Sequence, residues 1–170
     1  MKTKITLKIK VAIFLIGLAL LSPASIMAAD TNWPNWRGAG ENGSTSIGSY
    51  VTKFDNEKNV KWKTKLPAKG CSTPIVWKDQ IIITSPDGKN DTLVSFNWGG
   101  KKLWQTTVGN ERAGKHRNGS GSNPSAITDG KLLFAYFKSG NLAGFTLDGK
   151  LIWKTNLQQR FARDTLYWDI

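Results

Sequence analysis

The sequence predicts an all-β protein: a partial, open β-propeller of about two to three four-stranded antiparallel blades, preceded by a signal-peptide helix. Two observations predict this fold. A sequence repeat recurs at intervals of 42 and then 49 residues, and short apolar or alternating runs are separated by turn residues. Repeats of about this length that are rich in short strands are typical of propellers rather than of helical solenoids.

The repeat is marked by three tryptophans, Trp62, Trp104 and Trp153. Each stands eight residues after a phenylalanine and begins the same Trp-Lys/Gln-Thr-x-Leu/Val step. The last two copies also share a Gly-Lys pair before the tryptophan, at Gly100 and Gly149. Because an indole covers a large apolar area, we expect all five residues to be structural, docking one blade on the next. We expect Trp104 and Trp153 to be among the most buried side chains, with a backbone carbonyl accepting each indole N–H.

Each unit is predicted to hold four strands. The first strand follows a Ser-x-Pro element that recurs 50 residues apart, at 72–74 and 122–124. The second is an apolar run (81–84 and 132–137), the third carries Leu-x-x-Phe, and the fourth carries the tryptophan. Turn signals separate the strands at Asp87-Gly88, Asp129-Gly130, Ser139-Gly140 and Asp148-Gly149.

Trp62, the first of the three repeat tryptophans, is predicted to lie on a strand that belongs to no complete blade. Residues 61–66 alternate strictly, with lysines on one face and Trp62, Thr64 and Leu66 on the other. Lysines along such a strand also discourage pairing between sheet edges. The array is therefore expected to be open, with an unmatched strand near residues 60–66 and an unfinished blade after Asn156.

The first residues have the order of a secretion signal. Four lysines precede the apolar run 11–21, and a polar stretch with small residues follows. Cleavage is expected after Ala28 or Ala29, although an uncleaved membrane anchor is the alternative. The predicted organisation is a signal peptide (1–29), an N-terminal extension leading into the first strand (30–58), and the propeller repeats (59–170).

The net charge and the cysteine count indicate which kinds of partner and which cross-links are expected. Residues 30–170 carry a net charge of +8, which favours acidic surfaces without indicating a nucleic-acid role. A protein or cell-envelope partner is expected, and no stable membrane span after cleavage. The single cysteine, Cys71, excludes an intramolecular disulfide and is expected to be a small buried apolar group.

Longer motifs carry a family resemblance. The Gly-Lys-x-x-Trp step and the next Ser-x-Pro strand resemble the docking repeat of pyrroloquinoline-quinone (PQQ)-type propellers, which include quinoprotein alcohol dehydrogenases and the BamB subunit of the outer-membrane assembly machinery. The opening segment 33–43 resembles the start of exported PQQ-binding-like propeller proteins, as do 118–124 and 164–170. The sequence departs from the repeat's usual aspartate at Asn97 and Thr146.

The resemblance implies an N-terminal fragment of a longer propeller. It implies an exported, non-catalytic scaffold that binds protein in the cell envelope, with no cofactor. The alternative is the N-terminal fragment of a PQQ-dependent dehydrogenase-like enzyme. One cysteine cannot supply the adjacent pair that such dehydrogenases typically carry over the cofactor.

Three other patterns give only weak support for a phosphate-binding, catalytic or calcium site. Residues 109–115 have phosphate-loop spacing, but His116 stands where Ser or Thr is required and no helix is predicted to follow. His116 is the only histidine, which leaves little basis for catalysis. Asp87, Asn90 and Asp91 lack the loop length and bidentate glutamate of a calcium site, so a hairpin turn is expected there.

Overall fold

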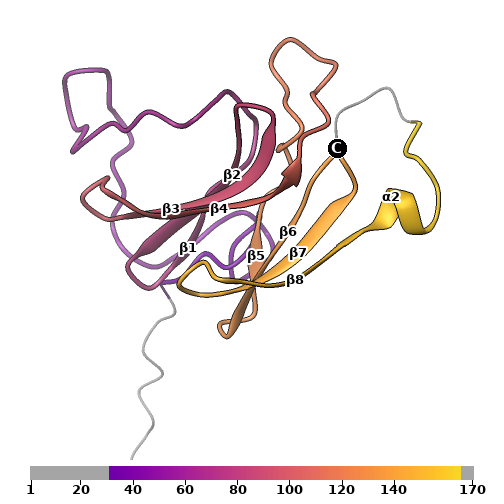
Figure 1. Cartoon of the computed structure of the whole chain (residues 1–170). Coiled ribbons are helices and arrows are strands. Elements are labelled where there is room, and N and C mark those ends of the chain that lie inside the picture. Colours follow the sequence, from indigo (N-terminus) through magenta and orange to yellow (C-terminus); the bar gives the residue numbers. More distant parts are fainter. Residues whose placement is uncertain (1–30, 166–170) are drawn as a thin grey trace, which may run out of the picture. The chain divides into compact units, whose positions relative to one another are not determined.

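The structure is a computed structural model that describes residues 31–165, all within one compact unit, Thr31–Ile170. The predicted signal peptide lies outside the described residues. Eight strands and one short helix are present in this part of the chain (Figure 1). In chain order they are β1 (Ile75–Trp77), β2 (Gln80–Asp87), β3 (Asn90–Asn97), β4 (Lys102–Asn110), β5 (Ile127–Thr128), β6 (Leu132–Tyr136), β7 (Asn141–Thr146), β8 (Leu151–Asn156) and α2 (Leu157–Arg160).

The strands form two four-stranded antiparallel sheets, β1-β2-β3-β4 and β5-β6-β7-β8, here called the first and second blade. The predicted partial propeller is confirmed, and each tryptophan strand is the last of its blade. A two-residue turn joins β2 to β3, and Gly88 in this turn has φ +62°, a conformation that glycine adopts readily. Both tryptophan strands carry a register shift, between Ser95 and Phe96 opposite β4 and between Gly144 and Phe145 opposite β8.

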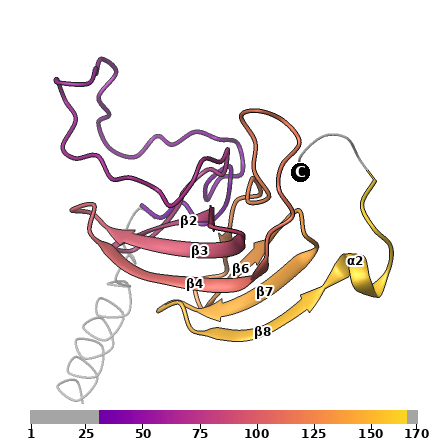
Figure 2. The same cartoon turned by 45° about the horizontal axis from the view of Figure 1, so that its top comes forward.

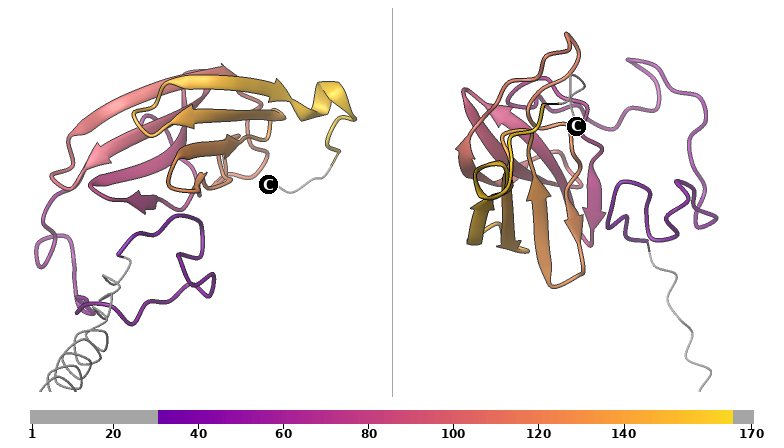
Figure 3. Two further views of the ribbon diagram at one scale, coloured as in Figure 1. Left: turned by 90° about the horizontal axis from the view of Figure 1, so that it is seen from below. Right: turned by 90° about the vertical axis from the view of Figure 1, so that its right-hand side faces the viewer.

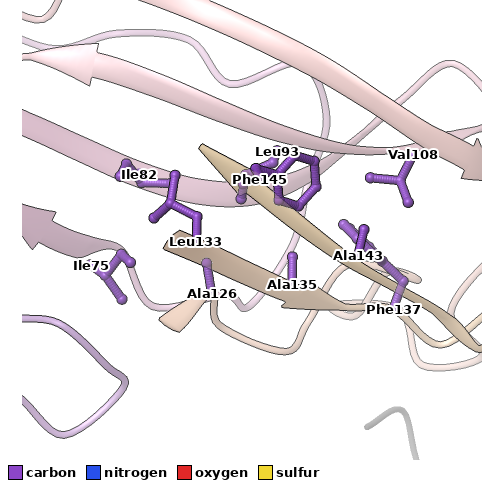
Figure 4. Close-up of a cluster of buried hydrophobic side chains, with 10 residues drawn as sticks. All are labelled: Ile75, Ile82, Leu93, Val108, Ala126, Leu133, Ala135, Phe137, Ala143 and Phe145. Carbon is purple, nitrogen blue, oxygen red and sulfur yellow. The ribbon is translucent and has the colours of Figure 1, made fainter. Parts of the chain in front are cut away.

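The main core lies between the two blades (Figure 4). Strand alternation sends Ile82 and Leu93 of the first blade toward Leu133 and Phe145 of the second, and all four are fully buried. Three small residues, Ala126, Ala135 and Ala143, belong to the same buried cluster. The blades are therefore held face to face by apolar packing.

The opposite face of the first blade is covered by residues that precede it. Ile83, Val94 and Phe96 form a second apolar cluster, against which Leu66 packs. The prediction of a strand at residues 60–66 is wrong, because this segment forms no ladder and lies as irregular chain across the blade. Within the described residues it has no sheet of its own to join, so side-chain packing rather than backbone pairing holds it.

The opening residues are anchored to both blades. Trp33 and Val76 exchange two backbone hydrogen bonds of 2.8 and 2.9 Å, and Thr128 N–H donates to the Pro34 carbonyl at 2.9 Å. Val76 is in β1 and Thr128 in β5, so one short segment touches the first strand of each blade. Figures 2 and 3 show the rest of 31–70 as irregular chain beside the sheets.

Candidate blade-docking residues and the cavity between the blades

Two of the repeat tryptophans, Trp62 and Trp104, lie against glycines of the blade that follows them. A Cβ atom at Gly100 would lie 2.7 Å from the Trp62 ring, and one at Gly149 would overlap the Trp104 ring. Both glycines have positive φ, +78° and +86°, so an alanine would be strained there even without the indole. Each position therefore requires glycine for backbone conformation and for space.

The two glycine turns use the residues that replace the repeat's usual aspartate. Gly100 N–H donates to the Asn97 carbonyl at 2.9 Å, and Gly149 N–H to the Thr146 carbonyl at 3.0 Å. The Asn97 side chain also accepts from the Gly99 and Lys101 N–H groups, and the Thr146 hydroxyl accepts from Lys150 N–H. An amide or hydroxyl oxygen thus provides the turn-closing acceptor.

The indole N–H groups are satisfied in two different ways. Trp62 Nε1 donates to the Trp98 carbonyl at 2.7 Å, so its acceptor is a backbone carbonyl, as expected. Trp104 Nε1 instead donates to the Gln80 side chain at 3.0 Å, and Gln80 Nε2 donates to the Leu147 carbonyl at 3.0 Å. Trp98 and Leu147 occupy the same place in the repeat, so Gln80 inserts one side chain into an otherwise equivalent link between blades.

The expected deep burial of the tryptophans is wrong. Trp104 is half-buried, and Trp153 is 40% exposed. One face of the Trp153 indole lies on Gly144 of its own blade, with Phe134 nearby at a ring-centroid distance of 6.3 Å. Its other side has no glycine turn from another blade among the described residues, which explains the difference from Trp104.

A polar cavity of about 620 Å³ opens where β4 meets the second blade. Its walls carry mostly amide and hydroxyl side chains: Asn110, Ser139, Asn141, Lys154, Asn156 and Gln159. Two hydrogen bonds, one within the second blade and one across the blade boundary, fix several of them. Asn156 Nδ2 donates to Asn141 Oδ1 at 3.0 Å, and Lys154 Nζ donates to the Val108 carbonyl at 2.9 Å. Asn156 also caps α2, its side chain accepting from Gln159 N–H.

A buried carboxylate of the first blade, that of Asp91, is hydrogen-bonded to two residues that line this cavity. Asp91, on β3, is fully buried and accepts hydrogen bonds from the Ser139 hydroxyl at 2.5 Å and Asn141 Nδ2 at 2.8 Å. Its Oδ1 has no hydrogen-bond partner among the described residues. Burial raises the pKa of Asp91 to about 6; hydrogen bonds from Ser139 and Asn141 oppose this rise, and the Glu111 carboxylate adds to it.

The raised pKa predicts a pH dependence of stability. A carboxyl whose pKa is higher in the folded than in the unfolded protein stabilises the fold fully below the unfolded value, 3.8, and this contribution is lost as the pH rises through about 6. Asp91→Asn should remove the dependence, so its melting temperature should improve relative to wild type between pH 4 and pH 7. Differential scanning calorimetry across that range measures the difference.

Asp148 is a suitable control, because its pKa is shifted in the opposite direction to that of Asp91. The Thr146 hydroxyl holds the pKa of exposed Asp148 below its ordinary value, so its contribution is present at neutral pH and lost as the pH falls. Asp148→Asn should therefore not gain stability on going from pH 4 to pH 7. Parallel pH profiles of wild type and Asp91→Asn would contradict the assignment to Asp91.

The other residues singled out in the sequence form no catalytic cluster. Residues 111–126 contain no helix, so the phosphate-loop spacing has no helix N-terminus to support it. His116 Nδ1 accepts the Asn118 N–H at 3.2 Å within this loop. Asp87 and Asp91 diverge, because Asp87 is exposed and bonded to Gln105 whereas Asp91 faces the second blade. The expected burial of Cys71 is wrong: its thiol is exposed and donates to the Asn118 carbonyl at 3.1 Å.

The segment 118–124 connects the two blades through the interior. Ser120 and Ser122 are buried, and the hydroxyl of Thr84 on β2 lies 2.9 Å from the Ser122 carbonyl and 2.7 Å from that of Pro124. A Cβ at Gly121 would lie 2.5 Å from the Arg112 carbonyl oxygen. Close packing thus explains Gly121 and the two buried serines.

Two docked, four-stranded antiparallel blades, each ending in a tryptophan strand, define a β-propeller repeat protein. The family model described as outer membrane protein assembly factor BamB matches residues 42–166, and the chain belongs to this family. A search of curated proteins gives no match. Among solved structures, BamB from Moraxella catarrhalis is similar at 22% identity and a TM-score of 0.33. That match covers 46% of this chain and 20% of the Moraxella chain, so this chain spans a small part of that protein.

Among the described residues, no helix has the length and apolar character needed to cross a bilayer.

Proposed function

We propose that this chain is an exported, non-catalytic propeller module that binds a protein partner in the bacterial cell envelope. The observation that carries the proposal is the family match over residues 42–166, whose description is that of an outer-membrane assembly factor. The leader pattern in residues 1–29 supports export to the periplasm or beyond. We further propose that Trp62, Trp104, Trp153, Gly100 and Gly149 hold the blades in position and contact no ligand.

The chemistry of the cavity favours binding over catalysis. Two of its amides, Asn141 and Asn156, are bonded to each other, and the Lys154 ammonium donates to the Val108 carbonyl. Within residues 31–165 one carboxyl has a pKa raised toward neutrality, that of Asp91, and it is fully buried and out of reach of a substrate. General acid–base catalysis needs a titrating group within hydrogen-bond reach of the reacting atoms.

The enzyme alternative has a direct test. Purified protein is incubated with PQQ and Ca²⁺, and ethanol-dependent reduction of a redox dye is followed. We expect no dye reduction above that of PQQ alone, and no rise in melting temperature, because a bound cofactor would stabilise the folded state by mass action. PQQ-dependent turnover or a saturable rise in melting temperature would favour the dehydrogenase-like alternative.

Export and partner binding are tested together in cells. N-terminal sequencing of the protein from the periplasmic fraction should begin at Ala29 or Asp30. After mild chemical cross-linking, the tagged chain should be recovered with an envelope protein in a fixed ratio. An intact Met1 in a membrane fraction would contradict cleavage and release, and recovery of the chain alone would contradict the binding role.

A further inference from the structure

The two blades have matching strand registers, so residues of the first blade have structural equivalents in the second. Ser95 pairs with Trp104 as Gly144 pairs with Trp153, and a register shift follows directly in both blades. The face that a blade turns toward its successor in the chain is here called its tail face, and the opposite one its head face. The tail faces are made by these equivalent pairs: Ile75 and Ile127, Ile82 and Phe134, Leu93 and Leu142, Trp104 and Trp153.

The two tail faces differ in how far they are covered. The three aliphatic residues of the first blade's tail face are fully buried in the core between the blades (Figure 4). In the second blade, Ile127 is 49% exposed and Trp153 is 40% exposed, while Phe134 and Leu142 are half-buried. The second blade thus carries the apolar pattern of a blade interface with no blade docked on it among residues 31–165.

The first blade carries the other half of this interface, at the opposite end of the array. Its second apolar cluster lies at the positions with which the second blade receives the first. The equivalent pairs are Ile83 and Ala135, Val94 and Ala143, Phe96 and Phe145. On this head face Leu66 of the irregular segment 60–66 packs where a preceding blade would lie. The two ends of the array therefore reproduce the two sides of the interface in its middle.

Segment 60–66 reproduces part of a blade contact. Trp62 lies on Gly100 as Trp104 lies on Gly149. Between the blades a second bond is added, because the Thr106 hydroxyl donates to the Gly149 carbonyl at 2.6 Å. The threonine at the equivalent position beside Trp62 makes no hydrogen bond within residues 31–165. The head face is thus covered less completely by this segment than by a docked blade.

We propose that the tail face of the second blade is a self-association site, which receives the head face of a second copy of this chain. Trp153 of one copy then replaces Trp62 on Gly100 of the second copy. Its indole N–H donates to the Trp98 carbonyl, as that of Trp62 does within one chain. The Thr155 hydroxyl donates to the Gly100 carbonyl, in the manner of the threonine bond between the blades. The proposal goes beyond the proposed partner binding and does not depend on it.

A contact between a tail face and a head face joins different surfaces of identical chains. Such heterologous contacts form a closed ring where the rotation closes and an open array where it does not. Each copy adds two four-stranded blades, and since closed propellers typically have four to eight blades, a ring holds about two to four copies. Every contact displaces Trp62 and Leu66 from a head face, so association depends on protein concentration.

Association is measured on the exported protein, purified from the periplasmic fraction, by size-exclusion chromatography with light scattering over a concentration series. The mass of the wild type should rise with concentration and level off at about two to four monomer masses. Ile127→Glu should stay monomeric, because it places a charge in the apolar interface.

Ile152→Glu is the matched control. Ile152 is also 49% exposed, and it lies next to Trp153 in β8. Its equivalent in the first blade, Leu103, is 46% exposed even though the second blade is docked there. This position therefore lies outside the interface, and Ile152→Glu should associate as the wild type does.

Trp62→Ala should have the opposite effect to Ile127→Glu. It removes the side chain that competes for Gly100, so association should begin at about tenfold lower protein concentration, because a larger fraction of molecules is competent to associate. Adding Ile127→Glu to Trp62→Ala should restore the monomer, which separates specific association from aggregation. Circular dichroism in dilute solution checks that each variant folds.

Three outcomes would overturn the proposal. A wild type that is monomeric at every concentration would leave the tail face to a further blade or to a different protein. Association of Ile127→Glu at the wild-type concentration would show that the tail face is not the contact. A Trp62→Ala variant that associates more weakly than the wild type would show that this indole does not compete with the second copy.

Discussion

Replacing Gly149 with alanine is expected to lower the free energy of unfolding by about 3 kcal/mol. Its φ of +86° costs an L-residue about 1–2 kcal/mol. The added Cβ also overlaps the Trp104 ring, and such overpacking adds about 1–3 kcal/mol. Urea unfolding at pH 7 measures the loss.

Gly88→Ala is the matched control for this effect. Gly88 also has positive φ, +62°, but a Cβ there would meet nothing within 4 Å. Its substitution should therefore cost about 1 kcal/mol from backbone strain alone. Equal losses for the two variants would mean that the Trp104 contact does not constrain Gly149.

The second large effect is expected at Trp104. Trp104→Ala should cost about 3 kcal/mol, the lower end of the range for large aromatic truncations, because the indole is half-buried. It also removes one of the two donors to Gln80 Oε1, leaving the Ser95 hydroxyl, and opens space over Gly149. Trp153→Ala should cost about 1 kcal/mol or less, since that indole is 40% exposed and lies on Gly144 and near Phe134 of its own blade.

Trp104 and Trp153 occupy equivalent positions in the sequence repeat but make different contacts in the structure. Sequence similarity alone predicts equal effects, because both residues follow the same Phe and Gly-Lys spacing. The structure predicts unequal ones. Thermal unfolding of both variants at one protein concentration decides between them, and equal shifts in melting temperature would contradict the docking geometry.

The blades could be predicted from sequence because their determinants are local. A continuous β-branched apolar run defines β2, a Leu-x-x-Phe step defines β3, and Asp-Gly or Gly-Lys pairs place the turns at Gly88, Gly100 and Gly149. The repeat then assigns the second blade from the first. The pairing of strands needed no long-range information, because each blade is built from consecutive antiparallel strands.

Features that depend on distant contacts were not predicted. Residues 60–66 have the alternation of a strand but no sheet to join within the described residues, so a local pattern gave the wrong element. The bridge between Trp33 and Val76 and the contact of Pro34 with Thr128 bring together residues far apart in the chain. Nothing in the local pattern around Trp33 indicates a partner in β1.

The candidate site was only partly visible in the sequence. The pairs Trp62–Gly100 and Trp104–Gly149 belong to the sequence repeat, whereas Gln80 occurs once, and its place between Trp104 and Leu147 has no local signature. The sequence around Asp91 indicates a hairpin turn and gives no sign that its carboxylate is buried. Its burial depends on Ser139 and Asn141, which belong to the other blade.

The central structural claim, that a tryptophan of one blade docks on a glycine of the next, is tested most directly by a double-mutant cycle. Trp104→Ala, Gly149→Ala and the double variant are unfolded in urea at pH 7. Removing the indole also removes the overlap at residue 149, so the double variant should lose at least about 1 kcal/mol less than the sum of the single losses. Losses that add to within about 0.5 kcal/mol would show that the two residues do not interact and would contradict the docking of the blades through this pair.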